Sequence, residues 1–268
     1  DEEVSRGLGD VYKRQDDSFS ETGKFSNVND ALVYAKQNLQ ESCEIIDIGA
    51  ESTKTQFKAR SDEEQLFKLI PLIESVKKEI PKVLISADTR SHLVAAKCID
   101  AGCQIINTVT SGENVDSMLD AIESTDAEII FTHMPEEHTK GTNMITDNIV
   151  DYLRNFFNTI RNKMIERGIN EERLIIDPGI SFGKTGNDNL TIIKNIETFV
   201  GEFSRVCLGV SHKKFSSKVY DTLTDKDQIY VDLSIHSFAA YKGVEILRVH
   251  DIDITHDLVK VVSATVKS

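Results

Sequence analysis

Three polar side chains, those of Asp88, Asn107 and Asp177, each stand at the end of a short apolar run. Two carboxylates and an amide hold hydrogen-bond acceptors and a donor in fixed planes. Such a set suits a ligand that carries several hydrogen-bonding groups. A single aspartate at a strand end could equally cap the next helix, but three around one opening favour a ligand.

Arg248 and His250 stand two positions apart in a further apolar run, so that on a strand both side chains would point to the same side. A guanidinium beside an imidazole suits a diphosphate, because arginine binds two oxygens at once and histidine donates one more hydrogen bond. A lone Arg-x-His is more often a solvated strand end, so the pair has to be interpreted together with the other strand ends.

These residues belong to a repeated pattern. Seven times a short apolar run ends in a polar or charged residue, and a helix-like stretch follows each time. Runs that are apolar on both faces belong in a covered parallel sheet, and ligands collect where such strands end. If the seven endings ring one opening, the site holds Asp47, Asp88, Asn107, His133, Asp177, Lys213, Arg248 and His250.

Between these runs the apolar residues change to helical spacing, as at Ile149, Leu153, Phe156 and Ile160. The predicted helices cover residues 28–39, 63–79, 91–101, 115–122, 149–164, 190–200, 228–241 and 251–266. Residues 136–146, with a glycine and several charges, are predicted to be a loop. The alternation of strand and helix favours an α/β fold.

Size and composition narrow the class. The chain has 268 residues, 40% of them hydrophobic, and about 250 residues is usual for one (β/α)8 barrel. Forty-four acidic against 31 basic residues leave a net charge of −13, which disfavours a nucleic-acid or anionic-membrane surface. The four cysteines form no Cys-x-x-Cys pair, which indicates buried, reduced thiols in a cytoplasmic protein. No run approaches the roughly 20 apolar residues of a membrane span.

The first fifteen residues do not fit the pattern. They show neither strand alternation nor a helical stripe, yet Asp17-Ser18-Phe19-Ser20 resembles a loop that leaves a barrel strand. We therefore expect a (β/α)8 TIM barrel whose first strand is missing or replaced. Residues 1–15 are interpreted as a non-native or foreign segment, and residues 16–268 as one barrel domain.

Six motifs, in order and spacing, resemble dihydropteroate synthase, a pterin-binding TIM-barrel family. They are Asp17-Ser18-Phe19-Ser20, Asp47-Ile48-Gly49-Ala50-Glu51-Ser52-Thr53, Ser86-Ala87-Asp88-Thr89, Ile105-Ile106-Asn107, Asp177-Pro178-Gly179-Ile180-Ser181-Phe182-Gly183-Lys184 and Arg248-Val249-His250-Asp251. The resemblance covers about residue 17 to the C-terminus. It implies a Mg²⁺-assisted condensation of 6-hydroxymethyl-7,8-dihydropterin diphosphate with 4-aminobenzoate to give dihydropteroate and diphosphate in folate synthesis. Its partners would be these small molecules. Whether the chain forms a homodimer stays open in the sequence.

The resemblance also implies roles for individual residues. The pterin would be bound by Asp88, Asn107, Asp177 and Lys213, the diphosphate by Arg248 and His250, and the aminobenzoate by Thr53, Lys54, Thr55, Ser181, Phe182 and Lys214. Lys213, Arg248 and His250 would be the catalytic residues. The helix N-terminus that follows Lys213 would receive the aminobenzoate carboxylate through backbone N–H groups.

Several positions depart from the family pattern. The asparagine that ligates Mg²⁺ in the family falls at about Lys13, so the metal ligands of this chain are unknown. Thr108 replaces an aspartate that follows Asn107 in the family. Lys54 and Thr55 replace an Arg-Pro pair, and a serine at position 181 replaces a glycine, all where the aminobenzoate would lie.

Other functions stay open. One is a barrel that presents methyltetrahydrofolate for methyl transfer, against which the Arg248-Val249-His250 motif argues. Another is a pterin-binding paralogue without synthase activity, which Thr108 and Lys54 leave possible. A zinc site at His133 and His138 lacks a third ligand at metal spacing.

Overall fold

Eight parallel strands form one sheet in the computed structural model, which describes residues 9–14, 43–50, 60–211, 213 and 225–266. The strand order is β6-β5-β4-β3-β2-β1-β8-β7. The strands are β1 (Gly9–Arg14), β2 (Ile45–Gly49), β3 (Leu84–Asp88), β4 (Ile105–Thr110), β5 (Glu128–His133), β6 (Leu174–Asp177), β7 (Cys207–Leu208) and β8 (Ile246–Val249).

The sheet closes on itself between β6 and β7. A parallel bridge joins Ile176 to Val206, and the Ile176 N–H donates to the Arg205 carbonyl at 3.1 Å. Each of the other neighbouring pairs is parallel as well. The predicted (β/α)8 barrel is therefore confirmed.

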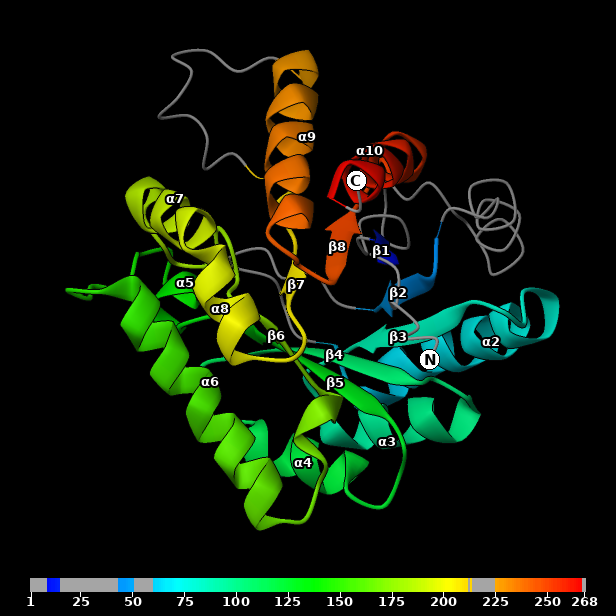
Figure 1. Ribbon diagram of the computed structural model, residues 1–268. Coiled ribbons are helices and arrows are strands. Elements are labelled where there is room, and N and C mark those ends of the chain that lie inside the picture. Colours follow the sequence, from blue (N-terminus) through cyan, green and yellow to red (C-terminus); the bar gives the residue numbers. More distant parts are fainter. Residues whose placement is uncertain (1–8, 15–42, 51–59, 212, 214–224, 267–268) are drawn as a thin grey trace, which may run out of the picture.

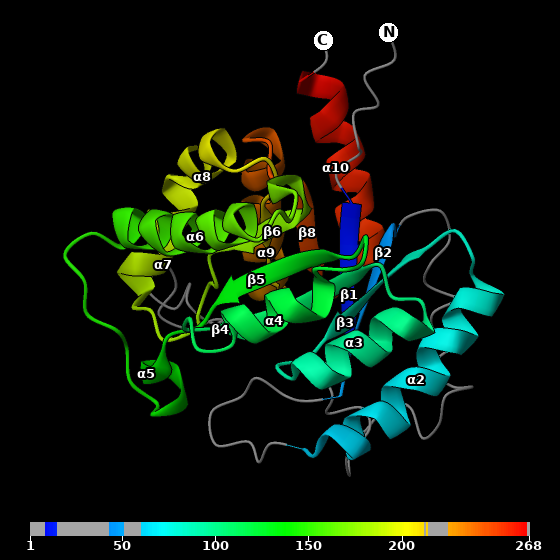
Figure 2. The ribbon, with the colours of Figure 1, turned by 90° about the horizontal axis from the view of Figure 1, so that it is seen from below.

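Helices surround the strands on the outside of the barrel (Figure 1), and a second view shows α10 beside β1 (Figure 2). The helices are α2 (Asp62–Glu79), α3 (His92–Ala101), α4 (Val115–Ile122), α5 (Glu136–Thr139), α6 (Ile149–Glu166), the 3₁₀ helix η2 (Glu171–Arg173), α7 (Gly186–Lys194), α8 (Ile196–Glu202), α9 (Asp225–Tyr241) and α10 (Ile252–Val266).

Local sequence sets several helix boundaries. Ser61 caps α2 by accepting from the Glu64 N–H at 3.3 Å, and the Glu64 carboxylate accepts from the Ser61 N–H at 3.0 Å. Thr185 and Asp188 form the same reciprocal box at the start of α7. Each box satisfies N–H groups that a helix start leaves without partners.

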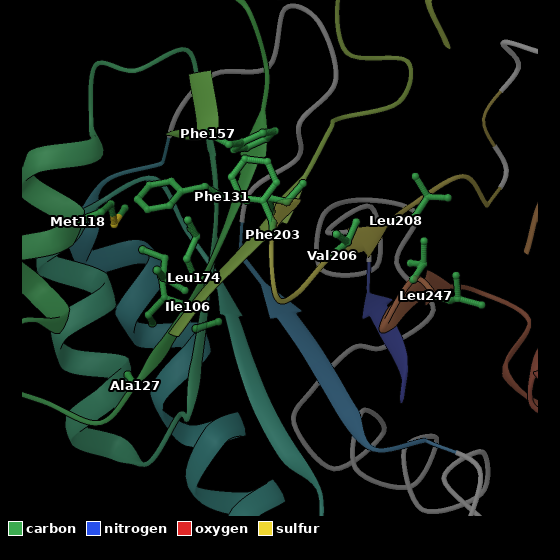
Figure 3. Packing of buried hydrophobic residues seen from close by; sticks show 14 of the residues in the cluster. Ile106, Met118, Ala127, Phe131, Phe157, Leu174, Phe203, Val206, Leu208 and Leu247 are labelled. Atoms are coloured by element: carbon green, nitrogen blue, oxygen red, sulfur yellow. The ribbon is translucent and has the colours of Figure 1, made fainter. Parts of the chain in front are cut away.

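The two largest buried apolar clusters of the described residues form layers. The larger layer lies between strands and helices, where Phe131 and Ile106 pack against Phe157 and Met118 (Figure 3). A smaller layer consists of one residue from each of six strands: Ile45, Ile105, Ile130, Ile175, Cys207 and Ile246. Because side chains alternate along a strand, this second set fills the barrel interior below the strand ends.

The seven strands expected from the sequence are present, and most helices lie within one to three residues of their predicted bounds. Four details were wrong. The strand expected to end at Asn107 continues to Thr110. The helix predicted over residues 190–200 is broken at Asn195, whose N–H donates to Thr191 and Ile192 and ends α7. Residues 136–146 begin with the short helix α5, and β7 ends at Leu208 rather than Ser211. The helix predicted over residues 28–39 lies outside the described residues.

The first-strand position is filled by β1, which pairs in parallel with β2 on one side and β8 on the other. Of the two expected alternatives, a missing or a replaced first strand, the structure excludes the missing one. Parallel pairing uses backbone N–H and C=O groups, so a segment without apolar alternation can still occupy the gap between two unpaired strand edges. That residues 1–15 are foreign or replacement sequence stays a prediction.

Candidate active site

A buried polar network spans β2, β3 and β4 inside the barrel. Asp47 accepts a hydrogen bond from the Ser86 hydroxyl at 2.7 Å and another from the Asn107 Nδ2 at 2.8 Å. All three residues are fully buried. Since Asp47 takes the Asn107 amide N–H, the Asn107 Oδ1 is left as an acceptor, with no hydrogen-bond partner among the described residues. Asn107 therefore offers an acceptor oxygen beside the second N–H of its amide.

Asp177 and Arg248 form a buried ion pair across the barrel. The Arg248 Nη2 donates to the Asp177 Oδ2 at 2.7 Å, and the Gly179 N–H donates to the Asp177 Oδ1 at 2.8 Å. Burial alone would lower the pKa of Arg248, but the carboxylates of Asp177, Asp47 and Asp88 outweigh it and raise that pKa. The guanidinium is thus a permanent cation at the ends of β6 and β8.

Two glycines make room for these charged groups. A Cβ at Gly209 would lie 2.9 Å from the Arg248 Nε, and one at Gly49 would lie 3.2 Å from the Asp88 Cβ. Asp88 is buried at the end of β3, and in the strand register it stands opposite Asn107. The register therefore brings together two predicted pterin-binding positions, Asp88 at the end of β3 and Asn107 within β4.

Lys184 fixes the loop that follows β6 through hydrogen bonds from its side chain. Its buried Nζ donates to the carbonyls of His133, Gly179 and Phe182 at 3.2, 2.9 and 3.1 Å. Burial lowers the pKa of Lys184 to about 7, against the opposing charge of Asp177. Gly179 has a φ of 71°, and a Cβ there would lie 1.9 Å from the His133 carbonyl oxygen, so no other residue fits this turn.

The same loop positions Lys213. The Lys213 Nζ donates to the Ile180 carbonyl at 2.8 Å and lies 4.6 Å from the centroid of the Phe182 ring. The contact combines a charge-assisted hydrogen bond with a cation–π interaction. Ser181, between the two loop partners, has a φ of 67° and donates its N–H to the Asn189 Oδ1 at 2.8 Å. The predicted residues Lys213, Ser181 and Phe182 are therefore brought together.

His250 follows β8, and its N–H donates to the Ser211 hydroxyl at 3.4 Å. It is half-buried, whereas Arg248 on the same strand is buried. The remaining predicted aminobenzoate residues, Thr53, Lys54, Thr55 and Lys214, lie outside the described residues.

Thr108 lies on the opposite face of β4 from Asn107. Its hydroxyl accepts a hydrogen bond from the Asn114 Nδ2 at 3.1 Å, and Asn114 is the residue that precedes α4. The substitution of an aspartate by Thr108 therefore does not change the inner side of the strand. Lys13, at the implied position of a metal ligand, stands opposite Asp47 in the β1–β2 register.

The two histidines considered for zinc have other contacts. The His133 ring lies edge-on to Tyr152 and Phe156, with centroids 5.5 and 4.8 Å away, and His138 lies edge-on to Phe182 at 5.2 Å. Within the described part of the chain, no three His, Cys, Asp or Glu residues are grouped so that they could hold a metal. The described cysteines are free thiols, and Cys98, Cys103 and Cys207 are buried.

Sequence reasoning counted Asp47 among the strand-end residues of the site but gave it no role, and it gave none to Lys184, although both lie inside the recognised motifs. Asp47 orients Asn107, and Lys184 fixes the loop that holds Lys213. The signal available in the sequence was their position next to strand ends. The partners of Asp47 and the His133 partner of Lys184 are far away in the chain, so no local pattern could give these two residues their roles.

The pterin-binding enzyme family model matches residues 10–250. This chain belongs to that family. It is 33% identical to the dihydropteroate synthase of Bacillus subtilis over 88% of this chain and 80% of that protein. It is 30% identical to the dihydropteroate synthase of Haemophilus influenzae over 93% of this chain and 90% of that protein.

The fold matches as well. The structure of the Clostridium difficile dihydropteroate synthase, determined in the presence of pteroic acid, superposes with a TM-score of 0.84 at 26% identity. The match covers 98% of this chain and 96% of that one. The Vibrio fischeri enzyme gives a TM-score of 0.78 at 27% identity, over 98% and 95% of the two chains. The family resemblance read from the six motifs is thereby confirmed.

Proposed function

We propose that this chain is a dihydropteroate synthase, a transferase of folate synthesis, and that the site described above joins a pterin diphosphate to 4-aminobenzoate. The observation that carries the proposal is the buried Asp177–Arg248 pair, which sets a carboxylate and a permanent cation side by side at the barrel mouth. A pterin edge needs the carboxylate, and a departing diphosphate needs the cation.

Asp88, Asn107 and Asp177 bind the pterin edge in this proposal. Asp177 uses one hydrogen bond at each oxygen, so further lone pairs stay available for an amino or ring N–H group. Asn107, oriented by Asp47, accepts a second N–H. Fixed acceptors of this kind bind without first having to reorient, which favours affinity and a single ligand orientation.

Arg248 and His250 bind the diphosphate. The Arg248 Nη1 is buried and has no hydrogen-bond partner among the described residues, so a phosphate oxygen can take it without breaking the pair with Asp177. In the reaction the bond from the pterin methylene carbon to the diphosphate oxygen breaks, and a bond from that carbon to the aminobenzoate nitrogen forms. The nitrogen then loses a proton. Arg248 stabilises the negative charge that develops on the leaving oxygen.

Lys213 and Phe182 form one wall of the aminobenzoate pocket in this proposal. The Phe182 ring offers an apolar surface for the benzene ring, and the Lys213 ammonium is held above it by the Ile180 carbonyl. Ser181 lies between them in the loop. Thr53, Lys54, Thr55 and Lys214 are proposed to complete the pocket from loops outside the described residues.

Mg²⁺ stays a proposed cofactor that the described residues do not accommodate. Lys13 occupies the position where the family resemblance implies an asparagine ligand, and an ammonium does not coordinate a cation. The described residues also contain no metal-binding cluster. No step above therefore passes through a metal, and a Mg²⁺ titration of the reaction rate measures whether one takes part.

We further propose that the chain forms a homodimer through α9 and α10, which pack against each other. Tyr241, Val261 and Val266 are 62%, 66% and 56% exposed on these helices, and a shared apolar face suits a two-fold interface. Sedimentation equilibrium tests this, with Val261→Glu expected to give monomers. No described helix is long and apolar enough to span a membrane, and a cytoplasmic location stays a prediction.

The central experiment measures dihydropteroate formation from the two substrates by purified protein. Lys213→Met should lower kcat/KM about 100-fold or more, because it removes a cation at the reacting centre. Lys242→Met is the matched control, since Lys242 pairs with Glu197 on the outer helices, and it should leave the rate unchanged.

The same assay separates the alternatives. A protein that binds 6-hydroxymethylpterin but forms no product would be the paralogue without synthase activity. A protein that binds methyltetrahydrofolate and not the pterin diphosphate would be the methyltransferase relative. Since Thr108 faces away from the inner side of β4, it no longer argues for the paralogue.

A further inference from the structure

Thr132 occupies an inward position on β5 that sequence reasoning did not assign. Two residues earlier, Ile130 belongs to the inner apolar layer, so alternation along the strand also turns Thr132 inward, one layer closer to the mouth. In the register Thr132 stands opposite Asp177 of β6 and Val109 of β4. It therefore lies in the polar layer that holds the proposed pterin residues.

The Thr132 hydroxyl is fully buried, and it has no hydrogen-bond partner among the described residues. Other threonines of this region differ. The Thr108 hydroxyl accepts from Asn114 at 3.1 Å, and the Thr110 hydroxyl accepts from the Gly112 N–H at 2.8 Å. Burying a hydroxyl without a partner is unfavourable, and valine has nearly the same shape without that cost. Among the described residues nothing pairs with this hydroxyl, which leaves it available to a ligand.

Two further buried atoms of the barrel interior are in the same condition, the Asn107 Oδ1 and the Arg248 Nη1. The Asn107 oxygen and the Asp177 carboxylate can only accept hydrogen bonds. A pterin edge also carries a carbonyl oxygen and ring nitrogens, which need donors. A hydroxyl between these acceptors can supply one.

We propose that Thr132 is a further pterin-binding residue whose hydroxyl donates to an acceptor atom of the pterin ring. The inference rests on the proposed function, because it takes a pterin as the ligand of this layer. It makes Thr132 a specificity-determining residue. Ring systems that present a donor at this point are still accepted by rotation of the hydroxyl, whereas those that present a C–H group leave it unpaired.

The test replaces Thr132 by valine and measures two quantities on the full chain. Calorimetry with 6-hydroxymethylpterin should show binding about three- to tenfold weaker in Thr132→Val, the loss expected for one neutral hydrogen bond. The melting temperature of the unliganded protein should stay equal or rise, because the variant removes an unpaired buried hydroxyl. Thr132→Ser keeps the hydroxyl and should restore most of the affinity.

Thr108→Val is the matched control on the outer face of the neighbouring strand. It removes a hydroxyl that does have a partner, so it should lower the melting temperature and leave pterin affinity unchanged. A Thr132→Val protein with unchanged affinity, or with a clearly lower melting temperature, would overturn the inference.

Failure of the proposed function has a different signature. If the wild-type protein does not bind 6-hydroxymethylpterin, both proposals fall together. If the wild type binds it and Asp177→Ala abolishes binding while Thr132→Val changes nothing, the pterin site stands and only the role of Thr132 is wrong.

Discussion

The two ends of the barrel use charge in opposite ways. At the end away from the mouth, Arg205 pairs with Glu128 at 2.5 Å and Glu245 at 2.9 Å, while its backbone carbonyl accepts the bond that closes the sheet. The inner layer of isoleucines and Cys207 lies next to it. At this end the charged side chains pair with one another, and Arg205 also takes part in closing the barrel.

At the mouth, by contrast, several buried polar atoms have no hydrogen-bond partner among the described residues. Asp177 holds Arg248 and Asp47 holds Asn107, yet the Arg248 Nη1, the Asn107 Oδ1 and the Thr132 hydroxyl have no partner within the described residues. Unpaired buried groups cost stability, and a fold keeps them where a ligand will pair with them. The comparison teaches that stability should respond to changes at both ends, and ligand binding only to changes at the mouth.

The largest effect is expected for Asp177→Ala. The variant removes the carboxylate that pairs with the buried Arg248 guanidinium. This loss should lower the free energy of unfolding by about 3–5 kcal/mol. It should also weaken pterin binding by about 2–4 kcal/mol, because donors of the ligand lose their acceptor. Urea unfolding and calorimetry measure the two losses.

Asp177→Asn is the companion variant, since it keeps the shape and one acceptor oxygen. It should recover part of the stability but little of the affinity, because the amide presents an N–H to a ligand donor. Unchanged pterin affinity in both variants would mean that Asp177 only holds Arg248 and the turn at Gly179.

Arg205→Met probes the other end. It removes the shared partner of Glu128 and Glu245 and should lower the free energy of unfolding by about 2–4 kcal/mol. At a temperature where the variant is folded, KM for both substrates should equal the wild-type value. A specific rise in the KM for the pterin diphosphate would contradict the claim that only the mouth affects ligand binding.

His133 offers a test through pH. It stands at the mouth end of β5 but packs against Tyr152 and Phe156 outside the barrel, and burial, aided by the charge of Lys184, lowers its pKa well below the ordinary 6.5. The unfolded chain takes up a proton near pH 6.5 while the folded chain does not. Stability should therefore fall as pH drops below about 6.5, by up to about 1.4 kcal/mol per pH unit.

His133→Phe removes this titration and keeps an aromatic ring against the same two neighbours. Melting temperatures measured from pH 7.5 to 5 should fall less steeply in the variant, with kcat/KM unchanged at pH 7.5. Equal slopes in the two proteins would show that other groups govern the acid sensitivity.

The smallest effect is expected for Ser181→Gly. A serine with a φ of 67° is strained, and glycine adopts this conformation without cost, so the variant should gain about 0.5–1 kcal/mol in stability. The KM for aminobenzoate should change more than that for the pterin diphosphate, since Ser181 lies beside Phe182 and away from β3 and β4. A loss of stability would indicate that its side chain packs usefully.

Much of the fold could be predicted from the sequence because its signals are local. Apolar runs of strand length, helical spacing and caps such as Ser61 act within a few residues, and they give seven strands and the helices between them. The family motifs then identify Asp88, Asn107 and Asp177, of which Asp88 and Asp177 end their strands whereas Asn107 lies within β4. The first strand was not predicted because β1 is held by pairing with its two neighbours and has no apolar pattern of its own.

The sequence by itself determined the repeated strand–helix unit, the cationic and acidic residue types at the strand ends, and the family. Tertiary structure alone decided which of these groups meet: Asp47 reaches Asn107 across 60 residues of chain, and Arg248 reaches Asp177 across 71. It also turned Thr108 outward and Thr132 inward. The physical reason is closure of the barrel, since hydrogen bonds between distant strands, and not any local preference, fix the register that sets these side chains side by side.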